Sequence, residues 1–405
     1  MDRTTSSTSA LTVTSWEGLL ASVPYSLGYR PRESAVLLGL RIGEGVARSR
    51  TAEVGPSARV HLRDLADPHG GPQLIEDFSA VMARDGCGDV FVVFYSGVPR
   101  DRLGTDPVVS QALATVRRLT GWANPPGPWV VGDEAYGPWG MGVGCAPATG
   151  DVTQLDHGVV AAELTFRGVS VASDRALLAV PPSADADLRR SAVRAAHQAA
   201  ARRRRLGHGG AALGLSPRDT GRLAAWRQHE WQRWRRLLER AGDDSRLRPG
   251  ADMELRAGDD GELGAADLGR LAVALEDPAL RDGVLCCFIG PPPGQVPTAA
   301  QAVAVLDRAL EPGGPRPDRA RLDPVTTVLR AVAAAVPAGT AAQALALLSW
   351  AAWWSGNGAQ ADVLAAQALE SGCRPRLAEL VDQALAHRIP PGWAAAGRHE
   401  DSAIR

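Results

Sequence analysis

The stretch VPYSLGYRPRESAVLLGLR, residues 23–41, places a polar loop directly before a long apolar run. Residues 35–42 are nearly all apolar, which is typical of a strand buried on both faces of a sheet. In the loop, Pro31 disfavours a helix at the residue before it, Gly28 can take a positive φ, and Ser34 can bond local backbone. The sequence therefore predicts a connection that leads into a central strand.

The neighbouring patterns extend this strand into a sheet. An S/T-x-x-E capping box predicts a short helix that starts near residue 14 and that Pro24 ends. Strands alternating with helices favour βαβ units and a mainly parallel sheet with flanking helices. Further strands are predicted at 58–63, 89–95 and 129–132, with helices at 74–83 and 108–119.

The second half of the chain has only helical patterns, from about residue 156 onward. A length of 405 residues also exceeds what one core usually holds. The predicted fold class is an α/β amino-terminal domain joined to an all-α carboxyl-terminal domain. The predicted parts are a disordered tail (1–13), the α/β domain (14–155), a helical connector with Arg-rich helices (156–250), an α-helical domain (251–392) and a second disordered tail (393–405).

The composition narrows the class of protein. The net charge is −1, and all 44 basic residues are arginine, which indicates a GC-rich genome and lowers the weight of any Arg-rich stretch. The five cysteines show no C-x-x-C spacing, so we expect no disulfide, metal or cofactor. The amino terminus lacks an apolar h-region, and the apolar run at 344–354 is too short for a bilayer. We expect a cytoplasmic protein without a membrane segment.

Several stretches together resemble one family. They are LLASVPYSLGYRPRESAVLLGLR (19–41), GPWGMGVGCAPATG (137–150), LAVALEDPALRD (271–282) and LLSWAAWWSGNGAQA (347–361). The sequence resembles the actinobacterial family called domain of unknown function 4192. The family's paired cysteines reduce here to Cys145. The resemblance implies that the chain shares the family's fold and its actinobacterial source, and it implies no activity.

The loop before the first predicted strand is the best candidate for a ligand site. It collects a phenol, a guanidinium, a carboxylate and a hydroxyl at a strand end, where pockets form in α/β sheets. Trp139 is predicted to wall the same cleft. The alternative is a rigid connector with no ligand. The candidate binding residues are Tyr25, Gly28, Arg30, Glu33, Ser34 and Trp139.

Residues 188–240 hold 14 arginines against three acids, with interleaved tryptophans. Such a mixture can bind single-stranded nucleic acid through phosphate contacts and base stacking. However, Trp231, Trp234 and Leu238 recur at helical spacing, which favours a core-facing stripe. We expect a solvated arginine face or acidic partners within the chain, and nucleic-acid binding is the alternative.

Other motifs lead to structural predictions. His229 and Glu230 begin like a zinc-protease motif, but Arg233 stands where the second histidine is needed. Arg281 and Asp282 are adjacent, so each is expected to find its own partner. Helices within 341–387 are expected to pack as one unit and to contact a protein partner. There Leu345, Leu348 and Ala352 would face Val363, Ala366 and Leu369.

No catalytic motif emerges from the sequence. The leading hypothesis is a non-catalytic binding or regulatory protein that binds a ligand or a protein. One alternative is a small-molecule hydrolase or transferase with its site in the loop from Tyr25 to Ser34. The second alternative is nucleic-acid binding through the Arg- and Trp-rich helices.

Overall fold

The structure is a computed structural model of the whole chain. It describes residues 13, 15–42, 52–84, 86–97, 99, 106–117, 127–139, 150–166, 169–207, 217–247, 264–387 and 389–395. The chain divides into two compact units. The first comprises residues 1–26 and 30–171, and the second comprises residues 27–29 and 172–405. The glycine-rich segment 140–144 and Cys145 lie outside the described residues.

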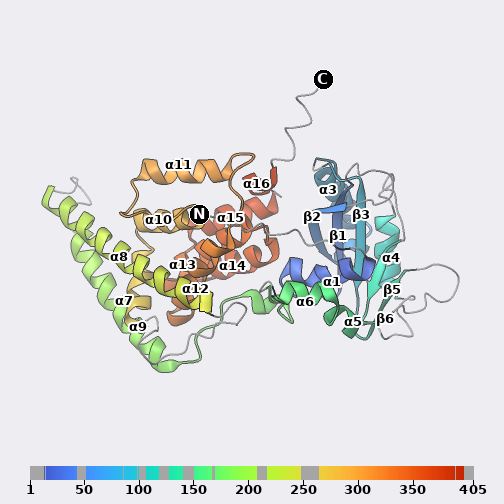
Figure 1. Ribbon diagram of the computed structural model, residues 1–405, viewed down its shortest axis with the longest axis horizontal. Helices are drawn as coiled ribbons and strands as arrows, with labels where there is room; N and C mark the ends of the chain where they lie inside the picture. Colours follow the sequence, from blue (N-terminus) through green and yellow to red (C-terminus); the bar gives the residue numbers. More distant parts are fainter. Residues whose placement is uncertain are drawn as a thin grey trace, which may run out of the picture. The chain divides into compact units, whose positions relative to one another are not determined.

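The first unit is built on a six-stranded open sheet of order β2-β1-β3-β4-β5-β6 (Figure 1). The central strand β1 is the apolar run that the sequence predicts, and its residues from Ala35 to Leu38 are buried. The predicted strand at 89–95 is confirmed as β3. The strands are β1 (Ser34–Ile42), β2 (Ala52–His61), β3 (Asp89–Tyr95), β4 (Trp129–Val131), β5 (Ala135–Pro138) and β6 (Gly150–Asp151).

The prediction of a mainly parallel sheet is wrong. Among the described strands only β3 and β4 pair in parallel, and every other pairing is antiparallel. The reason lies in the connections, because a parallel pair needs a crossover of a dozen or more residues. Only residues 43–51 join β1 to β2, and only residues 132–134 join β4 to β5. The long segment between β3 and β4, which contains a helix, permits the single parallel pair.

Helices cover both faces of the sheet. On one face, Ala35 and Leu37 of β1 share a core with residues of α2 (Leu62–Ala66), α3 (Gly70–Arg84) and α4 (Pro107–Val116). On the other face, Trp16 of α1 (Trp16–Leu27) stacks on Phe91 of β3 with ring centroids 5.4 Å apart. The first unit is therefore a three-layer α/β arrangement.

Helix α1 runs further than the sequence predicts. Pro24 lies inside the helix and does not end it. The helix ends at Leu27, and Gly28 follows with φ +78°, a left-handed conformation that often closes helices. The sequence prediction of a positive φ at Gly28 is confirmed.

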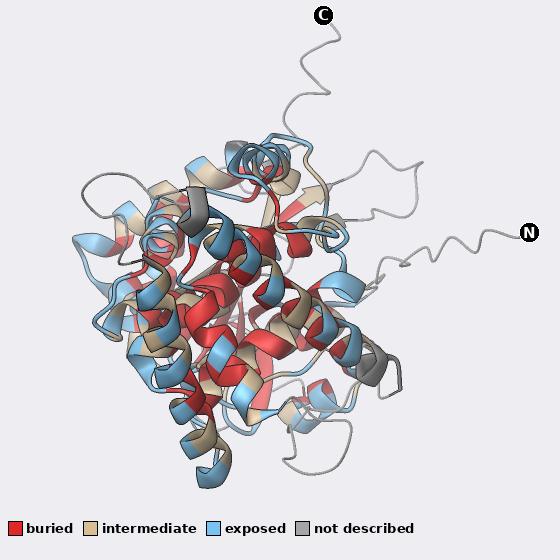
Figure 2. Ribbon diagram, turned by 90° about the vertical axis from the view of Figure 1, so that its left-hand side faces the viewer, coloured by how far each residue is buried: buried red, intermediate tan, exposed pale blue. Residues whose placement is uncertain are grey.

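The elements in the described part of the second unit are helices. Its described helices surround one apolar core, and Figure 2 shows the buried residues gathered toward their interior. Among the described residues, no helix is both long and apolar enough to cross a membrane. The elements are η2 (Arg175–Leu178), α7 (Ala186–Gly207), α8 (Pro217–Leu247), α9 (Ala265–Ala274), α10 (Pro278–Ile289), α11 (Ala299–Leu310), α12 (Arg319–Ala335), α13 (Ala338–Trp354), α14 (Gly358–Glu370), α15 (Arg376–Ala386) and α16 (Gly392–Ala395).

Residues 393–395 were expected in a disordered tail, but they belong to helix α16. Trp393 anchors this helix, because its indole Nε1 donates a hydrogen bond of 2.6 Å to the carbonyl of Trp354. Gly392 allows close approach, since a Cβ there would lie 2.3 Å from the carbonyl oxygen of Glu311. Helix α16 therefore extends past the predicted boundary at residue 392.

The tryptophans of the helical unit face its core. Trp231 and Trp234 of α8 are buried, which confirms the prediction from their spacing. Trp350, Trp353 and Trp354 of α13 are buried as well, and the Trp350 ring stacks on Trp354. These rings are therefore packing residues, and a surface partner cannot reach them in this fold.

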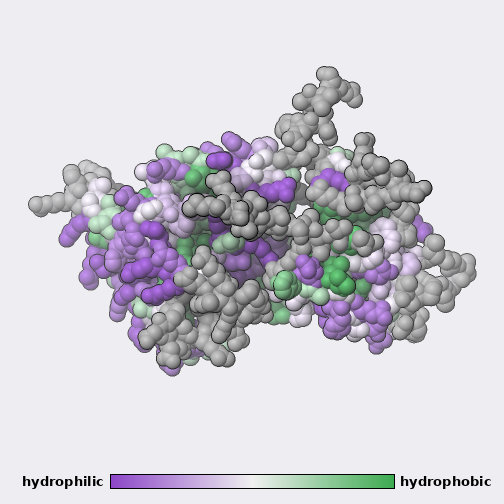
Figure 3. Space-filling model, viewed as in Figure 1, coloured by the Kyte–Doolittle hydropathy of each residue, from purple (hydrophilic) through white to green (hydrophobic). Residues whose placement is uncertain are grey.

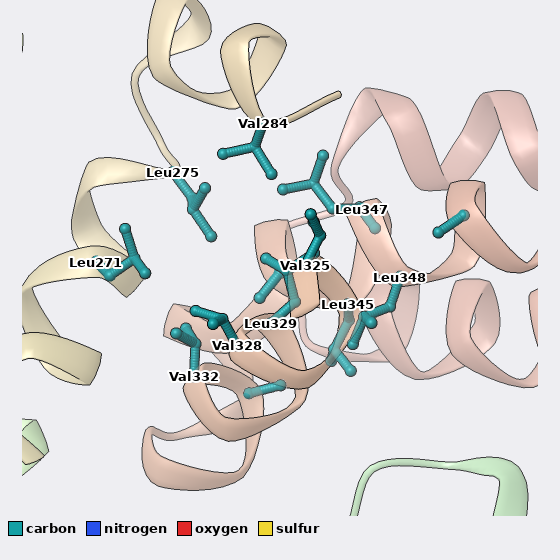
Figure 4. Packing of buried hydrophobic residues seen from close by; sticks show 14 of the residues in the cluster. Leu271, Leu275, Val284, Val325, Val328, Leu329, Val332, Leu345, Leu347 and Leu348 are labelled. Atoms are coloured by element: carbon teal, nitrogen blue, oxygen red, sulfur yellow. The ribbon is translucent and has the colours of Figure 1, made fainter. Parts of the chain in front are cut away.

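Helix α13 packs between α12 and α14, and its predicted core positions Leu345, Leu348 and Ala352 are buried (Figure 4). The predicted face of α14 is right at Leu369, which packs against the core, and wrong at Ala366. Its buried residues are Ala361, Leu364, Ala365 and Ala368, whereas Ala366 is exposed. Alanines occupy both sides of α14, so hydrophobicity alone did not mark the side that packs.

Replacement of Leu348 by Ala tests the packing of α13. This side chain is 3% exposed in the apolar core, so its truncation should lower the free energy of unfolding by about 2–5 kcal/mol. Leu380→Ala is the matched control, because Leu380 of α15 is 46% exposed and should cost within about 0.5 kcal/mol. Denaturant midpoints of both variants measure the difference. Equal midpoints would contradict the described core.

Candidate functional site

The ends of four strands meet at one edge of the sheet. Ser34 at the start of β1 pairs with His61 at the end of β2 and with Tyr95 at the end of β3. Tyr95 in turn pairs with Val131, where β4 ends. We name this end of the sheet the Ser34 edge. The predicted loop therefore lies where the carboxyl ends of three strands meet, a common position for sites in α/β proteins.

Glu33 fastens the start of β1 to the neighbouring strands. Its carboxylate Oε1 accepts a hydrogen bond of 2.8 Å from the backbone N–H of Gly97, two residues after the end of β3. Its carbonyl oxygen accepts one of 2.9 Å from the N–H of Leu62, directly after β2. Glu33 also has φ +43°, which is uncommon for a residue with a side chain and costs on the order of 1–3 kcal/mol. Two hydrogen bonds thus hold a strained residue in place.

The hydroxyl of Ser34 is enclosed by partners. Ser34 is fully buried, and its Oγ donates a hydrogen bond of 2.6 Å to the carbonyl oxygen of Arg32. The same oxygen accepts a hydrogen bond of 2.7 Å from Nε of Arg59 on β2. Because its proton points to a carbonyl and no base accepts it, Ser34 lacks the arrangement of an activated nucleophile.

Tyr25 and Arg30 each reach a different helix. The hydroxyl of Tyr25 lies 3.1 Å from Oγ1 of Thr165 on α6 (Val159–Phe166), a helix that runs beside α1 in Figure 1. Arg30 Nη2 donates to Asp156 Oδ1, at 2.6 Å, at the end of α5 (Val152–Asp156). Both groups of this ion pair are more than a third exposed, so its contribution to stability is modest.

Tyr95 carries a perturbed hydroxyl at the same edge. Burial raises the pKa of Tyr95 above its ordinary value, and the nearby positive charge of Arg30 lowers it to a smaller degree. The phenol therefore stays protonated at neutral pH. It can act as a hydrogen-bond donor and not as a base.

Two predicted site residues lie elsewhere. Gly28 belongs to the second unit, where its carbonyl oxygen accepts a hydrogen bond of 2.9 Å from Ala172 N–H. Trp139 is buried in the core beneath α2, α3 and α4, and its backbone N–H donates a hydrogen bond to the carbonyl of Pro128, just before β4 begins. Trp139 thus lies toward the start of β4, whereas the Ser34 edge is at its end. The structure does not bring Trp139 to the predicted loop.

The sequence analysis did not identify Gly97, an exposed glycine close to two carboxylates. A Cβ built on Gly97 would lie 3.3 Å from Glu33 Oε1 and 3.7 Å from Asp133 Oδ2. Gly97 and Asp133 are both exposed. We name Glu33, Gly97 and Asp133 the carboxylate cradle. The position of Gly97 two residues after the apolar run DVFVVFY was a signal that could have found it.

Further polar groups lie near the cradle. Ser96 donates a hydrogen bond of 2.6 Å to Asp106 Oδ2, and the other oxygen of this carboxylate caps α4 by accepting from Val108 N–H at 2.8 Å. His61 has a buried Nδ1 without a hydrogen-bond partner in the described structure. A buried orphan atom of this kind often marks an unseen water or a functional position.

The described residues offer little for metal or thiol chemistry. Among them, no three His, Cys, Asp or Glu side chains are placed to hold a metal ion. Cys87, Cys286, Cys287 and Cys373 are free thiols. Burial raises the pKa of Cys286 to about 11 and that of Cys287 to about 12, so both thiols are protonated at neutral pH and poor nucleophiles.

The Arg-rich helices use several arginines within the unit. Arg227 binds Asp277 at the start of α10 through Nε and Nη2, and Arg233 binds Asp267 of α9 at 3.1 Å. Arg203 of α7 pairs with Glu276. Other residues of α7 and α8 form a hydrophilic surface in Figure 3. Because Trp226, Trp231 and Trp234 are buried, none of these three rings on the described part of α8 is presented for base stacking.

Arg281 and Asp282 correct one prediction. They were expected to find separate partners, but Nη2 of Arg281 lies 3.0 Å from Oδ1 of Asp282. The arginine side chain is long enough to turn back toward its neighbour, so adjacent helical positions do not prevent this pair. The pair leaves no free charge here for an anion.

The fold and the edge define a protein with a mixed α/β unit, whose sheet presents a polar edge, and a separate helical unit. A family model, the domain of unknown function DUF4192, matches residues 17–392. The chain belongs to this family. No curated protein and no solved structure matches it.

Variants of Glu33 test how the Ser34 edge is held. Glu33→Ala loses the hydrogen bond to Gly97, so it should lower the free energy of unfolding by about 1 kcal/mol. Glu33→Gly loses the same bond but relieves the positive φ, so it should be more stable than Glu33→Ala by about 1 kcal/mol. Glu33→Gln keeps an acceptor and should stay close to the parent. Chemical denaturation measures all three, and a glycine variant less stable than the alanine variant would contradict the strain.

Proposed function

We propose that this protein is a non-catalytic binding protein and that the carboxylate cradle of its α/β unit receives the ligand. The observation that carries the proposal is a contrast between the engaged and the exposed groups at the Ser34 edge. The polar side chains suited to chemistry are engaged by structural partners, while Gly97 and Asp133 stay exposed. The proposal keeps the cytoplasmic location and the actinobacterial origin expected from the sequence.

Three features support binding over catalysis. The hydroxyl of Ser34 is fully buried and donates to a carbonyl oxygen. The phenol of Tyr25 shares a hydrogen bond with Thr165, and the guanidinium of Arg30 is paired with Asp156. A nucleophile needs an adjacent base, and a general base needs a free lone pair near its substrate. Neither condition is met by these residues.

The cradle suits a cationic group. Oε1 of Glu33 and Oδ2 of Asp133 both lie within 4 Å of the position that a Cβ on Gly97 would take, and glycine leaves that position open for a ligand group. Carboxylates bind ammonium and guanidinium groups through charge-assisted hydrogen bonds. We propose that the ligand presents such a group, carried either by a small amine or by a basic side chain of a protein partner.

Strain at Glu33 agrees with this role. Non-glycine residues in the left-handed backbone conformation are retained where the surrounding structure holds them, and they concentrate at sites that clamp ligands. The backbone of Glu33 places its carboxylate against Gly97, so the cradle is formed before the ligand arrives. A preformed site lowers the ordering cost of binding.

Calorimetric titration with arginine amide tests the proposal, and citrulline amide, its uncharged analogue, is the matched ligand. The parent protein should bind arginine amide and not citrulline amide. Asp133→Asn should weaken binding about tenfold or more, because it removes a charge-assisted contact. Gly97→Ala should also weaken it, because the methyl group fills the cradle.

Glu76→Gln is the control variant, since Glu76 is an exposed acid on α3, and it should bind like the parent. Equal binding by Asp133→Asn and Glu76→Gln would reject the cradle. Conversion of arginine amide into a product during the titration would reject the non-catalytic assignment. If only basic peptides bind, and do so through Asp133, the ligand is a protein partner.

A further inference from the structure

Helix α8 carries a row of basic side chains on one exposed face. Arg222, His229, Arg236 and Arg240 are all exposed. They follow one another at intervals of seven, seven and four residues, and side chains at these intervals fall on one face of an α-helix. With a rise of about 1.5 Å per residue, the row is about 27 Å long. We name these four residues the basic row of α8.

The arginines of the basic row have no partner in the described structure. Among the described residues, neither a hydrogen bond nor an ion pair engages Arg222, Arg236 or Arg240. By contrast, exposed Arg376 of α15 pairs with Glu379 at 3.3 Å. Like charges four residues apart on a helix, such as Arg236 and Arg240, repel each other. A bound anion would therefore stabilise the row.

Few acids oppose this positive charge. On the described side chains of α7 and α8, the exposed acids are Asp187 and Glu239. Each lies beside an arginine outside the row, because Asp187 pairs with Arg190 and Glu239 lies 4.0 Å from Arg235. A GC-rich genome accounts for arginine in place of lysine, but it does not account for the scarcity of acids. The charge of the row is therefore available to a binding partner.

Helix α7 adds basic side chains next to α8. The two helices contact each other, and Figure 1 shows them side by side. Arg202 and Arg205, in the last two turns of α7, are exposed and have no hydrogen bond or ion pair among the described residues. Arg222 lies near the start of α8. These three arginines therefore lie toward the end of the helix pair at which the chain passes from α7 to α8.

The described part of this surface does not present the side chains that anchor proteins or unpaired bases. None of the large hydrophobic residues exposed on the described chain lies on α7 or α8. Protein interfaces usually depend on aromatic or aliphatic anchors, and single strands depend on rings for base stacking. The phosphate backbone of a duplex requires only positive charge, since it carries about one negative charge per 1.7 Å of helix axis.

We propose that the basic row of α8, together with the end of α7, binds double-stranded nucleic acid through its phosphate backbone. At about 3.4 Å per base pair, the row spans about eight base pairs. Contacts with phosphates position a protein on a duplex and carry no sequence information, so the binding is independent of sequence. This surface lies in the second unit and does not depend on the carboxylate cradle.

Fluorescence anisotropy of a labelled DNA duplex of about 20 base pairs, titrated with the full chain, tests the proposal. Affinity should fall steeply with salt, with a slope of about −4 in a double logarithmic plot if about five arginines contact phosphates. A labelled thymidine single strand of the same length should bind more weakly, because no described ring of α8 is presented for stacking.

The triple variant Arg222→Gln, Arg236→Gln, Arg240→Gln tests the row itself. It should weaken duplex binding about tenfold or more and reduce the steepness of the salt slope by about three. The matching triple lysine variant keeps the three charges and should bind the duplex within about threefold of the parent, because phosphate contacts depend mainly on charge. The control replaces three exposed arginines outside α7 and α8 by glutamine, at Arg63, Arg308 and Arg316. It removes the same charge and should bind like the parent.

Equal loss of binding in the glutamine variant of the row and in the control would overturn the proposal, because only net charge would then matter. Unchanged binding in the glutamine variant of the row, or no duplex binding by the parent at low salt, would also overturn it. Poly-glutamate is the probe for an acidic protein. If it displaces the duplex at a lower concentration of charge than unlabelled duplex does, the partner is an acidic protein and the nucleic-acid assignment is wrong.

Discussion

The antiparallel insertion of β1 between β2 and β3 is the constraint on which the first unit depends. The strand is buried on both faces, so it must lie inside the sheet. The short link to β2 makes that pair antiparallel, because it cannot contain a crossover. Strands β2, β3 and β4 then point the same way, and the start of β1 lies among their carboxyl ends. The loop at the start of β1 is thereby brought to the edge where strands of α/β sheets usually carry their sites.

The same constraint explains why this loop is so polar. Three of its polar side chains bind different elements of the unit: Arg30 binds α5, Glu33 binds the backbone after β3, and Ser34 binds β2. A loop confined among several strand ends has many unpaired backbone groups nearby, and polar side chains satisfy them. Arg30, Glu33 and Ser34, which the sequence offered as candidate ligand-binding residues, thus hold the edge together, and the accessible Gly97 and Asp133 come from other loops.

The sequence predicted which segments are buried better than it predicted the directions of the strands or the packed side of a helix. The apolar run from residue 35 and the spacing of Trp231 and Trp234 predicted buried positions correctly, because burial follows directly from hydrophobic pattern. Strand direction depends on connection length, which the pattern does not show. The packed side of α14 could not be read because small residues occupy both sides. Gly97 and Asp133 could not be predicted as neighbours of Glu33, since only the strand register brings them together.

Glu33 links the strand ends, and hydrogen exchange at two backbone amides tests this link most directly. The N–H of Leu62 is bonded to the Glu33 carbonyl, and the N–H of exposed Gly97 is bonded to its carboxylate. Both amides should exchange at least about a hundredfold more slowly than unstructured amides. Exchange at both should occur through opening of the α/β unit, which breaks these hydrogen bonds. If the Gly97 amide exchanges as fast as an unstructured one, Glu33 does not hold the edge and the account is wrong.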